Sequence, residues 1–239
     1  MFLSKALKRE NNNLDIFRLF AALSVIFGHA YALSPMDGAV DPIGRLLGYT
    51  YSGDLAVKSF FFLSGLVVTN SLLVRRNIIN FCIARFFRIW PAFTFVILMS
   101  SLIVGPILTN LKVSEYFSNI GVYSYIYKNI FMNISYGLPG LFSENPYKNA
   151  VNGSLWTIPY EIGAYLFLIV LYLFGIFQRN KVVPTIIAIL IILDPLFNNR
   201  LVFTFLVDDS YRFLAPSFAF GALLALHKDY FLVVFQKVC

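Results

Sequence analysis

The chain has 239 residues, of which 59% are hydrophobic and only 13% are charged. Soluble domains are about 45–50% apolar and about 25% charged, so this composition excludes an ordinary soluble protein and indicates one that crosses a membrane several times. The net charge of +7 does not indicate nucleic-acid binding, because the basic residues fall mostly in short gaps between apolar runs, and Cys82 and Cys239 offer neither a disulfide framework nor metal-ligand spacing.

Six apolar runs are each close to the ~20 residues that a helix needs to cross a bilayer. They lie at about 14–33, 56–74, 86–108, 154–177, 182–198 and 211–227. A seventh run begins at Phe231 but holds too few residues to cross, so we expect either an interfacial tail or a C-terminally incomplete chain. The sequence therefore predicts an all-α, polytopic transmembrane helical bundle with six to seven spans, in a single domain over residues 1–239.

Lys and Arg residues in the short connections predict the orientation of the chain. Three basic stretches are expected on the cytoplasmic side: the N-terminal arm with Lys5, Lys8 and Arg9, the second connection with Arg75, Arg76, Arg85 and Arg88, and the fourth with Arg179 and Lys181. The first and fifth connections carry aspartates, among them Asp208 and Asp209, and are expected outside. We therefore predict an integral, multi-pass protein of the plasma (inner) membrane with a cytoplasmic N-terminus. A cleaved signal peptide is disfavoured, because the first apolar run is too long.

A long outer loop is expected at 109–152, between the third and fourth spans. Nine of its residues are aromatic, among them Tyr123, Tyr127 and Tyr147. Because a loop of this length rarely lacks structure of its own, we expect a helix over about 118–134, along or within the membrane. The tyrosines could stack on sugars or form an interfacial belt, and the sequence favours neither.

Arg18 and His29 are the most informative pair in the first span. They lie eleven residues apart, about three helical turns, so both side chains share one face and stand ~16 Å apart along the axis. Ionisable residues inside a membrane are costly and mark functional sites by default. The alternatives are a snorkelling arginine paired with Asp15, and a histidine packed against a neighbouring helix. The common face favours a path through the membrane that joins the two residues.

Arg85 and Arg88 lie one turn apart where the third apolar run begins. Two guanidinium groups in this arrangement can bind an anion through paired hydrogen bonds, although the positive-inside rule alone would also supply them. Pro91 is expected to break or kink the helix just beyond the pair.

Glu161 lies about seven residues into the fourth span, roughly 10 Å from its outer end. A carboxylate at that depth needs a partner, and His29 is expected at a similar depth, so the two could pair. A carboxylate beside an imidazole orients the ring and raises its basicity; the alternative is a structural polar contact. In the second span, Ser64 and Gly65 are expected to let a neighbouring helix approach closely.

Four segments together resemble the acyltransferase-3 family of membrane-bound O-acyltransferases. They are LDIFRLFAALSVIFGHAY with its R-x10-H spacing, VKSFFFLSGLVVTNSL, ARFFRIWPAF with its R-x-x-R, and GLPGLFSENPYKNAVNGSLWTIPYE. They cover roughly 14–165 in the family's order. Members of this family usually have about ten spans of the length counted above, so the resemblance implies a chain truncated by roughly three spans.

The resemblance implies transfer of an acyl group, usually acetyl, from cytoplasmic acyl-CoA to a hydroxyl of a surface or lipid-linked glycan. The family's essential basic residues carry over to Arg18, His29, Arg85 and Arg88, and its glutamate after the NGSLW element carries over to Glu161. The implied donor is acyl-CoA, expected to be acetyl-CoA, and no metal is implied.

The residues fit such a route through the membrane. CoA is polyanionic, and Arg18, Arg85 and Arg88 on the cytoplasmic side could hold its phosphates. The rise of ~16 Å to His29 is comparable to the reach of the pantetheine arm. His29 would then act as general base on the acceptor hydroxyl, or accept the acyl group transiently, with Glu161 orienting it.

Two other functions remain open from the sequence. Intramembrane Arg, His and Glu residues also form proton relays, so a proton-coupled secondary transporter is the main alternative. The chain shows no internal repeat, which disfavours a transporter built from inverted repeats. The second alternative is an inactive fragment of the acyltransferase.

Overall fold

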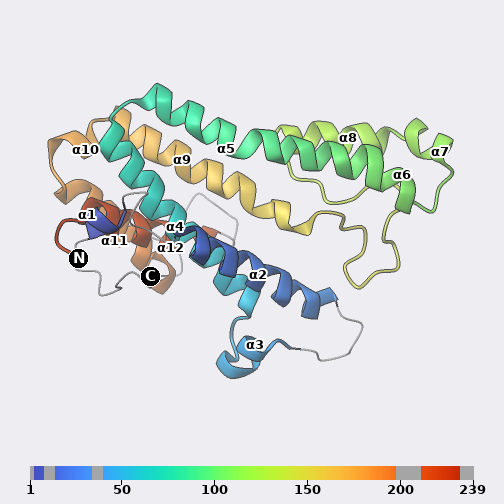
Figure 1. The fold of residues 1–239 in the computed structure, drawn as a ribbon, viewed down its shortest axis with the longest axis horizontal. Helices are drawn as coiled ribbons and strands as arrows, with labels where there is room; N and C mark the ends of the chain where they lie inside the picture. The colour runs from blue at the N-terminus through green and yellow to red at the C-terminus, as the bar shows by residue number, and fades with distance from the viewer. Residues whose placement is uncertain (1–2, 8–13, 34–39, 198–210, 232–239) are drawn as a thin grey trace. The chain divides into compact units, whose positions relative to one another are not determined.

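The computed structural model describes residues 3–7, 14–33, 40–197 and 211–231, and every regular element in these ranges is a helix (Figure 1). The predicted all-α class is therefore confirmed for this part of the chain. The elements are α1 (Leu3–Ala6), α2 (Leu14–Leu33), α3 (Pro42–Leu47), α4 (Ser52–Arg75), α5 (Ile78–Met99), a π-helical turn (Ser100–Val104), α6 (Gly105–Leu108), α7 (Val113–Ser118), α8 (Ile120–Ile130), a 3-10 helix (Gly153–Thr157), α9 (Ile158–Leu173), α10 (Ile176–Arg179), α11 (Val182–Leu193), a 3-10 helix (Asp194–Phe197) and α12 (Tyr211–Leu226).

The helices group into two compact units, each described by itself. Unit 1 comprises Met1–Ala32, Gly38–Asn77 and Gly163–Cys239, and unit 2 comprises Leu33–Asp37 and Ile78–Ile162. This division describes how the helices cluster, and the single functional domain over 1–239 stays a prediction.

Four helical stretches among the described residues are long and apolar enough to cross a membrane. They are Leu14–Tyr31, Ser52–Arg75, Ile78–Leu108 and Gly153–Leu173, and two shorter apolar helices follow at Val182–Phe197 and Leu214–Leu226. All six coincide with predicted apolar runs, as expected of a membrane protein, while the total of six to seven crossings stays a prediction. Some predicted features lie outside the described residues. They are the run beyond Phe231, the basic residues Lys8 and Arg9, and the aspartates predicted to face outward, Asp208 and Asp209.

Three helix boundaries differ from the predicted ones. α4 begins at Ser52 and α5 at Ile78, earlier than the predicted 56 and 86, because polar residues near their starts hide both helices from a count of apolar residues. α9 ends at Leu173 rather than near 177, because Gly175 adopts a φ of 71°. That left-handed conformation favours glycine and ends helices.

The third span is continuous from Ile78 to Leu108, so the helix is not broken at Pro91, and the alternative of a kink there stays a prediction. The irregular turn comes later, at Ser100–Val104, where the N–H of Gly105 bonds to the Ser100 carbonyl five residues back. Pro106 has no N–H, so the neighbouring carbonyl of Ser101 also loses its partner within the helix.

The outer loop predicted at 109–152 contains the helices α7 and α8, so the predicted helix within it is confirmed, with α8 shorter than expected. The side chain of Asn119 caps α8 by accepting from the N–H of Gly121 at 2.8 Å. α8 lies beside the far half of α5 (Figure 1), with Val122, Tyr125 and Asn129 on its buried face.

In unit 1, α4 and α12 pack closely through a pair of glycines. A Cβ atom added at Gly65 would lie 2.0 Å from the carbonyl oxygen of Phe218, and one added at Gly221 would lie 2.0 Å from that of Phe62. The rings of Phe62 and Phe220 lie beside this contact with centroids 5.7 Å apart. The predicted close approach at Gly65 is therefore confirmed.

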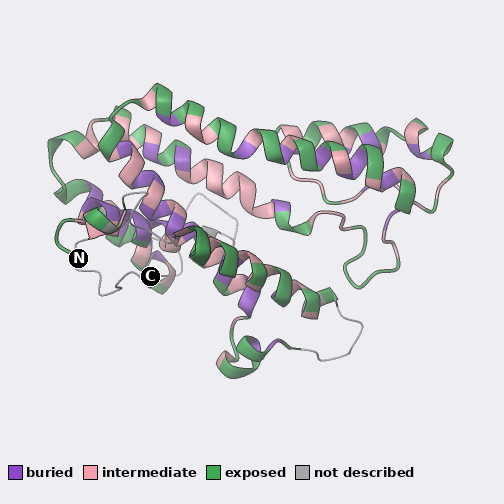
Figure 2. Cartoon of the chain, in the orientation of Figure 1, coloured by how far each residue is buried: buried purple, intermediate pink, exposed green. Residues whose placement is uncertain are grey.

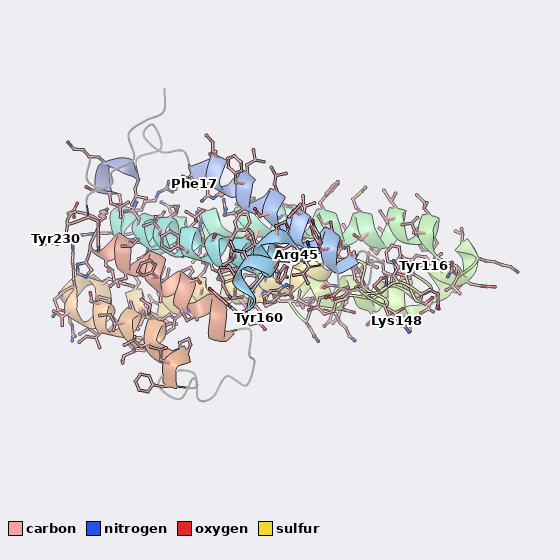
Figure 3. The ribbon with its side chains drawn as sticks, turned by 90° about the horizontal axis from the view of Figure 1, so that it is seen from below. Phe17, Arg45, Tyr116, Lys148, Tyr160 and Tyr230 are labelled. Carbon is pink, nitrogen blue, oxygen red and sulfur yellow. The ribbon has the colours of Figure 1, made fainter. Side chains whose placement is uncertain are left out.

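The first span, α2, is largely exposed within unit 1. In Figure 2 it is mostly green, whereas buried residues gather on α4 and α12. Its apolar side chains, such as Phe17, Phe20 and Ile26, are more than half exposed, and Figure 3 shows Phe17 and its neighbours projecting from the helix. Exposed apolar side chains on a helix of spanning length are suited to a lipid environment.

Replacing Gly65 with alanine should force α4 and α12 apart, because the atoms nearest the new methyl group belong to the backbone. Overpacking of this kind costs about 1–3 kcal/mol or more. We expect a lower midpoint of thermal unfolding for the purified protein in detergent. The matched control is Gly153→Ala, where an added Cβ has no heavy atom within 4 Å. An equal midpoint for the two variants would contradict the glycine-mediated contact.

Candidate active site

Arg18 and His29 lie on one continuous helix, α2, as predicted. Arg18 Nη1 lies 2.9 Å from Asp15 Oδ1, which confirms the expected pairing. The Asp15 side chain is 94% exposed, so this ion pair contributes little to stability. It uses one of the five N–H donors of the guanidinium group.

His29 is oriented by its own helix. Its Nδ1 lies 2.8 Å from the backbone carbonyl oxygen of Val25, one turn earlier. A carbonyl only accepts hydrogen bonds, so Nδ1 is the donor in this contact, and in the neutral tautomer that makes it Nε2 is the acceptor nitrogen. The ring is half-buried. The role of His29 as a general base stays a prediction.

The first turn of α4 meets α2 directly beside His29. A Cβ atom added at Gly28 would lie 2.6 Å from the backbone nitrogen of Gly53, and Ser52 Oγ donates to the Ser24 carbonyl at 3.4 Å. A side chain at Gly28 would push this turn away from the helix that carries the imidazole. The sequence did not predict this contact, although a glycine next to an intramembrane histidine was a visible signal.

Arg85 and Arg88 lie one turn apart on α5, in unit 2. The Arg85 guanidinium carbon lies 5.9 Å from the centroid of the Phe81 ring, a cation–π contact, and its side chain is half-buried. Arg88 is exposed. Because the helix begins at Ile78, the pair lies two turns inside it rather than at its start. Anion binding by the pair stays a prediction.

Glu161 lies in the first turn of α9, directly after the 3-10 helix Gly153–Thr157. It is half-buried, and the positive end of the helix dipole favours a carboxylate there. The rings of Trp156 and Tyr160 meet edge to face nearby, with centroids 5.8 Å apart. The pairing of Glu161 with His29 stays a prediction, because Glu161 and His29 belong to different units.

Asn152, the first residue of the NGSLW element, connects this segment to the third span. Its Nδ2 donates to Ser100 Oγ at 2.7 Å and to Tyr125 Oη at 3.0 Å. The two partners are buried. The sequence singled out the segment but not these partners, which lie 52 and 27 residues away from Asn152.

The hydroxyl of Tyr116 compensates for the irregular turn of the third span. It donates to the Ser101 carbonyl at 2.8 Å, the acceptor left without a helical partner by Pro106. A Cβ at Gly105 would lie 2.0 Å from this hydroxyl, so the glycine makes room for it. Burial, with a smaller contribution from neighbouring Tyr125, raises the pKa of Tyr116 to about 12. Burial also raises the pKa of Tyr125, against the opposing effect of its hydrogen bonds to Asn152 and Ser100.

Replacing Tyr116 with phenylalanine should leave the Ser101 carbonyl unsatisfied and reduce the free energy of unfolding by about 1–3 kcal/mol. Because the pKa of Tyr116 is raised, its contribution to the free energy of unfolding depends on pH in the alkaline range. Its contribution is complete below pH 10.0, the pKa of free tyrosine, and is lost as the pH rises through about 12. Unfolding in detergent across this range should therefore show a steeper alkaline loss of stability for the wild type than for Tyr116→Phe. The control is Tyr127→Phe, at an exposed position; the same alkaline profile for Tyr116→Phe and the wild type would contradict the assignment.

Comparison with known proteins adds to this geometry. The sequence profile of a family described as an acyltransferase domain matches residues 11–237. An O-acetyl transferase of Shigella phage Sf6 is 34% identical over 157 residues, which are 66% of this chain and 44% of that protein. Nodulation protein 10 of Rhizobium leguminosarum bv. viciae is 30% identical over 166 residues, 65% of this chain and 42% of that protein. The chain thus aligns with less than half the length of these curated relatives, and no solved structure matches it.

Proposed function

The chain belongs to the acyltransferase-3 family, and we propose that it transfers an acyl group, acetyl in the first instance, from cytoplasmic acyl-CoA to a hydroxyl of a surface or lipid-linked glycan. The observation that carries the proposal is the arrangement of His29. This imidazole lies in a helix of spanning length, and its Nδ1 donates to the Val25 carbonyl. In the neutral form of the ring, Nε2 is then available to accept a proton. The phage relative is named an O-acetyl transferase, which supports an oxygen acceptor.

Three arginines are proposed to bind the phosphates of the donor. Guanidinium groups match phosphate oxygens through paired hydrogen bonds. Arg88 is exposed, Arg85 is half-buried over Phe81, and Arg18 holds Asp15 through one of its N–H donors. The basic residues of the N-terminal arm and of the second and fourth connections predict that these segments face the cytoplasm, where acyl-CoA is made.

In the proposed reaction, Nε2 of His29 removes the proton of the acceptor hydroxyl as its oxygen attacks the thioester carbonyl. The new C–O bond forms, the C–S bond breaks, and the sulfur of CoA leaves with the proton from the imidazolium. Because the Val25 carbonyl already occupies Nδ1, Glu161 would stabilise the imidazolium through its charge rather than as the partner of Nδ1. Transient acylation of Nε2 is the alternative route to the same product.

Replacing His29 with alanine in the intact gene product should abolish acyl transfer, by about 100-fold or more, since it removes the general base. The protein should still insert into the membrane. The measurement is transfer of radiolabelled acetyl groups from acetyl-CoA to cell-envelope glycan. The matched control is His227→Gln, at the chain's other histidine, which bonds to Thr185 at 2.7 Å. An active His29→Ala variant would rule out this role.

Replacing Arg85 or Arg88 with alanine should raise the KM for acetyl-CoA, because a charge-assisted hydrogen bond contributes about 1.5–3 kcal/mol, or roughly tenfold or more in affinity. Arg75→Ala is the control, since Arg75 is exposed at the end of α4. An unchanged KM in both arginine variants would exclude phosphate binding by this pair.

A proton-coupled carrier is the second candidate for these ionisable residues. The same assay separates the two functions. A carrier would move a solute and leave the glycan unlabelled, whereas the acyltransferase labels it.

A further inference from the structure

The first outer connection holds a buried carboxylate that the proposed chemistry does not use. Asp41 is 2% exposed. Burial of a carboxylate is costly unless hydrogen bonds stabilise the charge. The partners of Asp41 therefore indicate what it holds in place.

Those partners are backbone N–H groups at the starts of two helices. Asp41 Oδ1 accepts from Ile43 at 2.9 Å and from Gly44 at 3.1 Å, which caps α3. The N–H of Ser52, the first residue of α4, lies 3.2 Å from Oδ2 and 3.4 Å from Oδ1. The residues Asp41 and Ser52 are eleven positions apart, so one carboxylate joins α3 to the first turn of α4.

That first turn is the part of α4 that touches α2 beside the imidazole. The backbone of Gly53 packs on Gly28, and Ser52 Oγ bonds to the carbonyl of Ser24. Gly28 immediately precedes His29, and Ser24 immediately precedes Val25, whose carbonyl fixes Nδ1. A shift of the first turn of α4 would therefore displace both the imidazole of His29 and the Val25 carbonyl that orients it.

We propose that Asp41 is a positioning residue for His29: it fixes the first turn of α4, which in turn fixes the outer half of α2. This inference rests on the proposed function of His29 as general base. In enzymes, a misplacement of about 1 Å can cost about 100-fold in rate. Loss of the Asp41 tether should accordingly lower kcat and leave donor binding unchanged, because the hydrogen bonds of Asp41 described above go to the starts of α3 and α4.

A substitution at Asp41 can weaken its contact with α4 while the cap on α3 is kept, because both α3 N–H groups bond to Oδ1 and the closer acceptor of Ser52 is Oδ2. Asparagine is as good a helix cap as aspartate, so Asp41→Asn should keep the contact of Oδ1 with α3. Its NH2 group would replace Oδ2, the closer acceptor of the Ser52 N–H at 3.2 Å, and would leave only the 3.4 Å contact of that N–H with Oδ1. If the tether to α4 matters, Asp41→Asn should fold as the wild type does and still lose activity. If capping of α3 is the whole role, Asp41→Asn should match the wild type in both respects.

The experiment compares Asp41→Asn and Asp41→Ala with Glu144→Gln, a control at an exposed carboxylate in the other unit. Acetyl transfer is measured on the intact gene product, with rates normalised to folded protein. We expect kcat to fall by about tenfold or more in both Asp41 variants, with an unchanged KM for acetyl-CoA. The Glu144→Gln variant should match the wild type.

A second readout does not depend on activity. The chain has two histidines, so a His227→Gln background leaves His29 as the single imidazole. Its rate of modification by diethyl pyrocarbonate, followed by ultraviolet absorbance, reports how closely the α4 turn covers it. We expect this rate to rise several-fold in both Asp41 variants, and the Gly28→Ala substitution to raise it without adding to the effect of Asp41→Ala, since both release one contact.

The outcomes separate the two hypotheses. Faster modification with no acetyl transfer by the wild type would support the tether and overturn the proposed function. Wild-type kcat and wild-type modification rates in Asp41→Asn would overturn the tether. A rise in KM with unchanged kcat would overturn it as well, because it would place Asp41 with the donor instead of with His29.

Discussion

Inside a bilayer no water is present to satisfy a polar group, so each one must find its partner within the protein. Two of the described contacts illustrate this constraint. The Ser101 carbonyl, released by Pro106, accepts from Tyr116, and the imidazole of His29 donates to its own helix. Among the described hydrogen bonds, His29 uses only Nδ1. The proposed reaction uses Nε2.

The same environment explains why the site depends on glycines. Lipid tails are as apolar as leucine, so helices in a membrane associate through close packing of small residues rather than through the hydrophobic effect. Gly65 and Gly221 bring α4 onto α12, and Gly28 brings the first turn of α4 onto α2. The position of His29 is therefore set by backbone contacts, with Asp41 holding the turn that makes them.

Much of this could be predicted from the sequence, because hydropathy directly reports which segments a bilayer accepts. The apolar runs located the four long apolar helices and the two shorter ones among the described residues, and helical periodicity placed Arg18 and His29 on one continuous helix. The helix is not broken at Pro91, and the irregular turn lies just before Pro106. The missed contacts are those between segments distant in sequence, such as Ser24 with Ser52 and Asn152 with Ser100, which no local pattern encodes. The carboxylate partner predicted for His29 stays a prediction, and the backbone carbonyl that its Nδ1 bonds to, one turn away, was not predicted.

The central claim is that acyl groups pass from a donor on the cytoplasmic side to an acceptor on the outer side, along the face of α2 that runs from Arg18 to His29. The most direct measurement uses inside-out and right-side-out membrane vesicles from cells with and without the gene, each given radiolabelled acetyl-CoA from the external medium. We predict alkali-labile label on the vesicle glycan only in inside-out vesicles that contain the gene product. Equal labelling of right-side-out vesicles, or no difference between cells with and without the gene, would contradict this route.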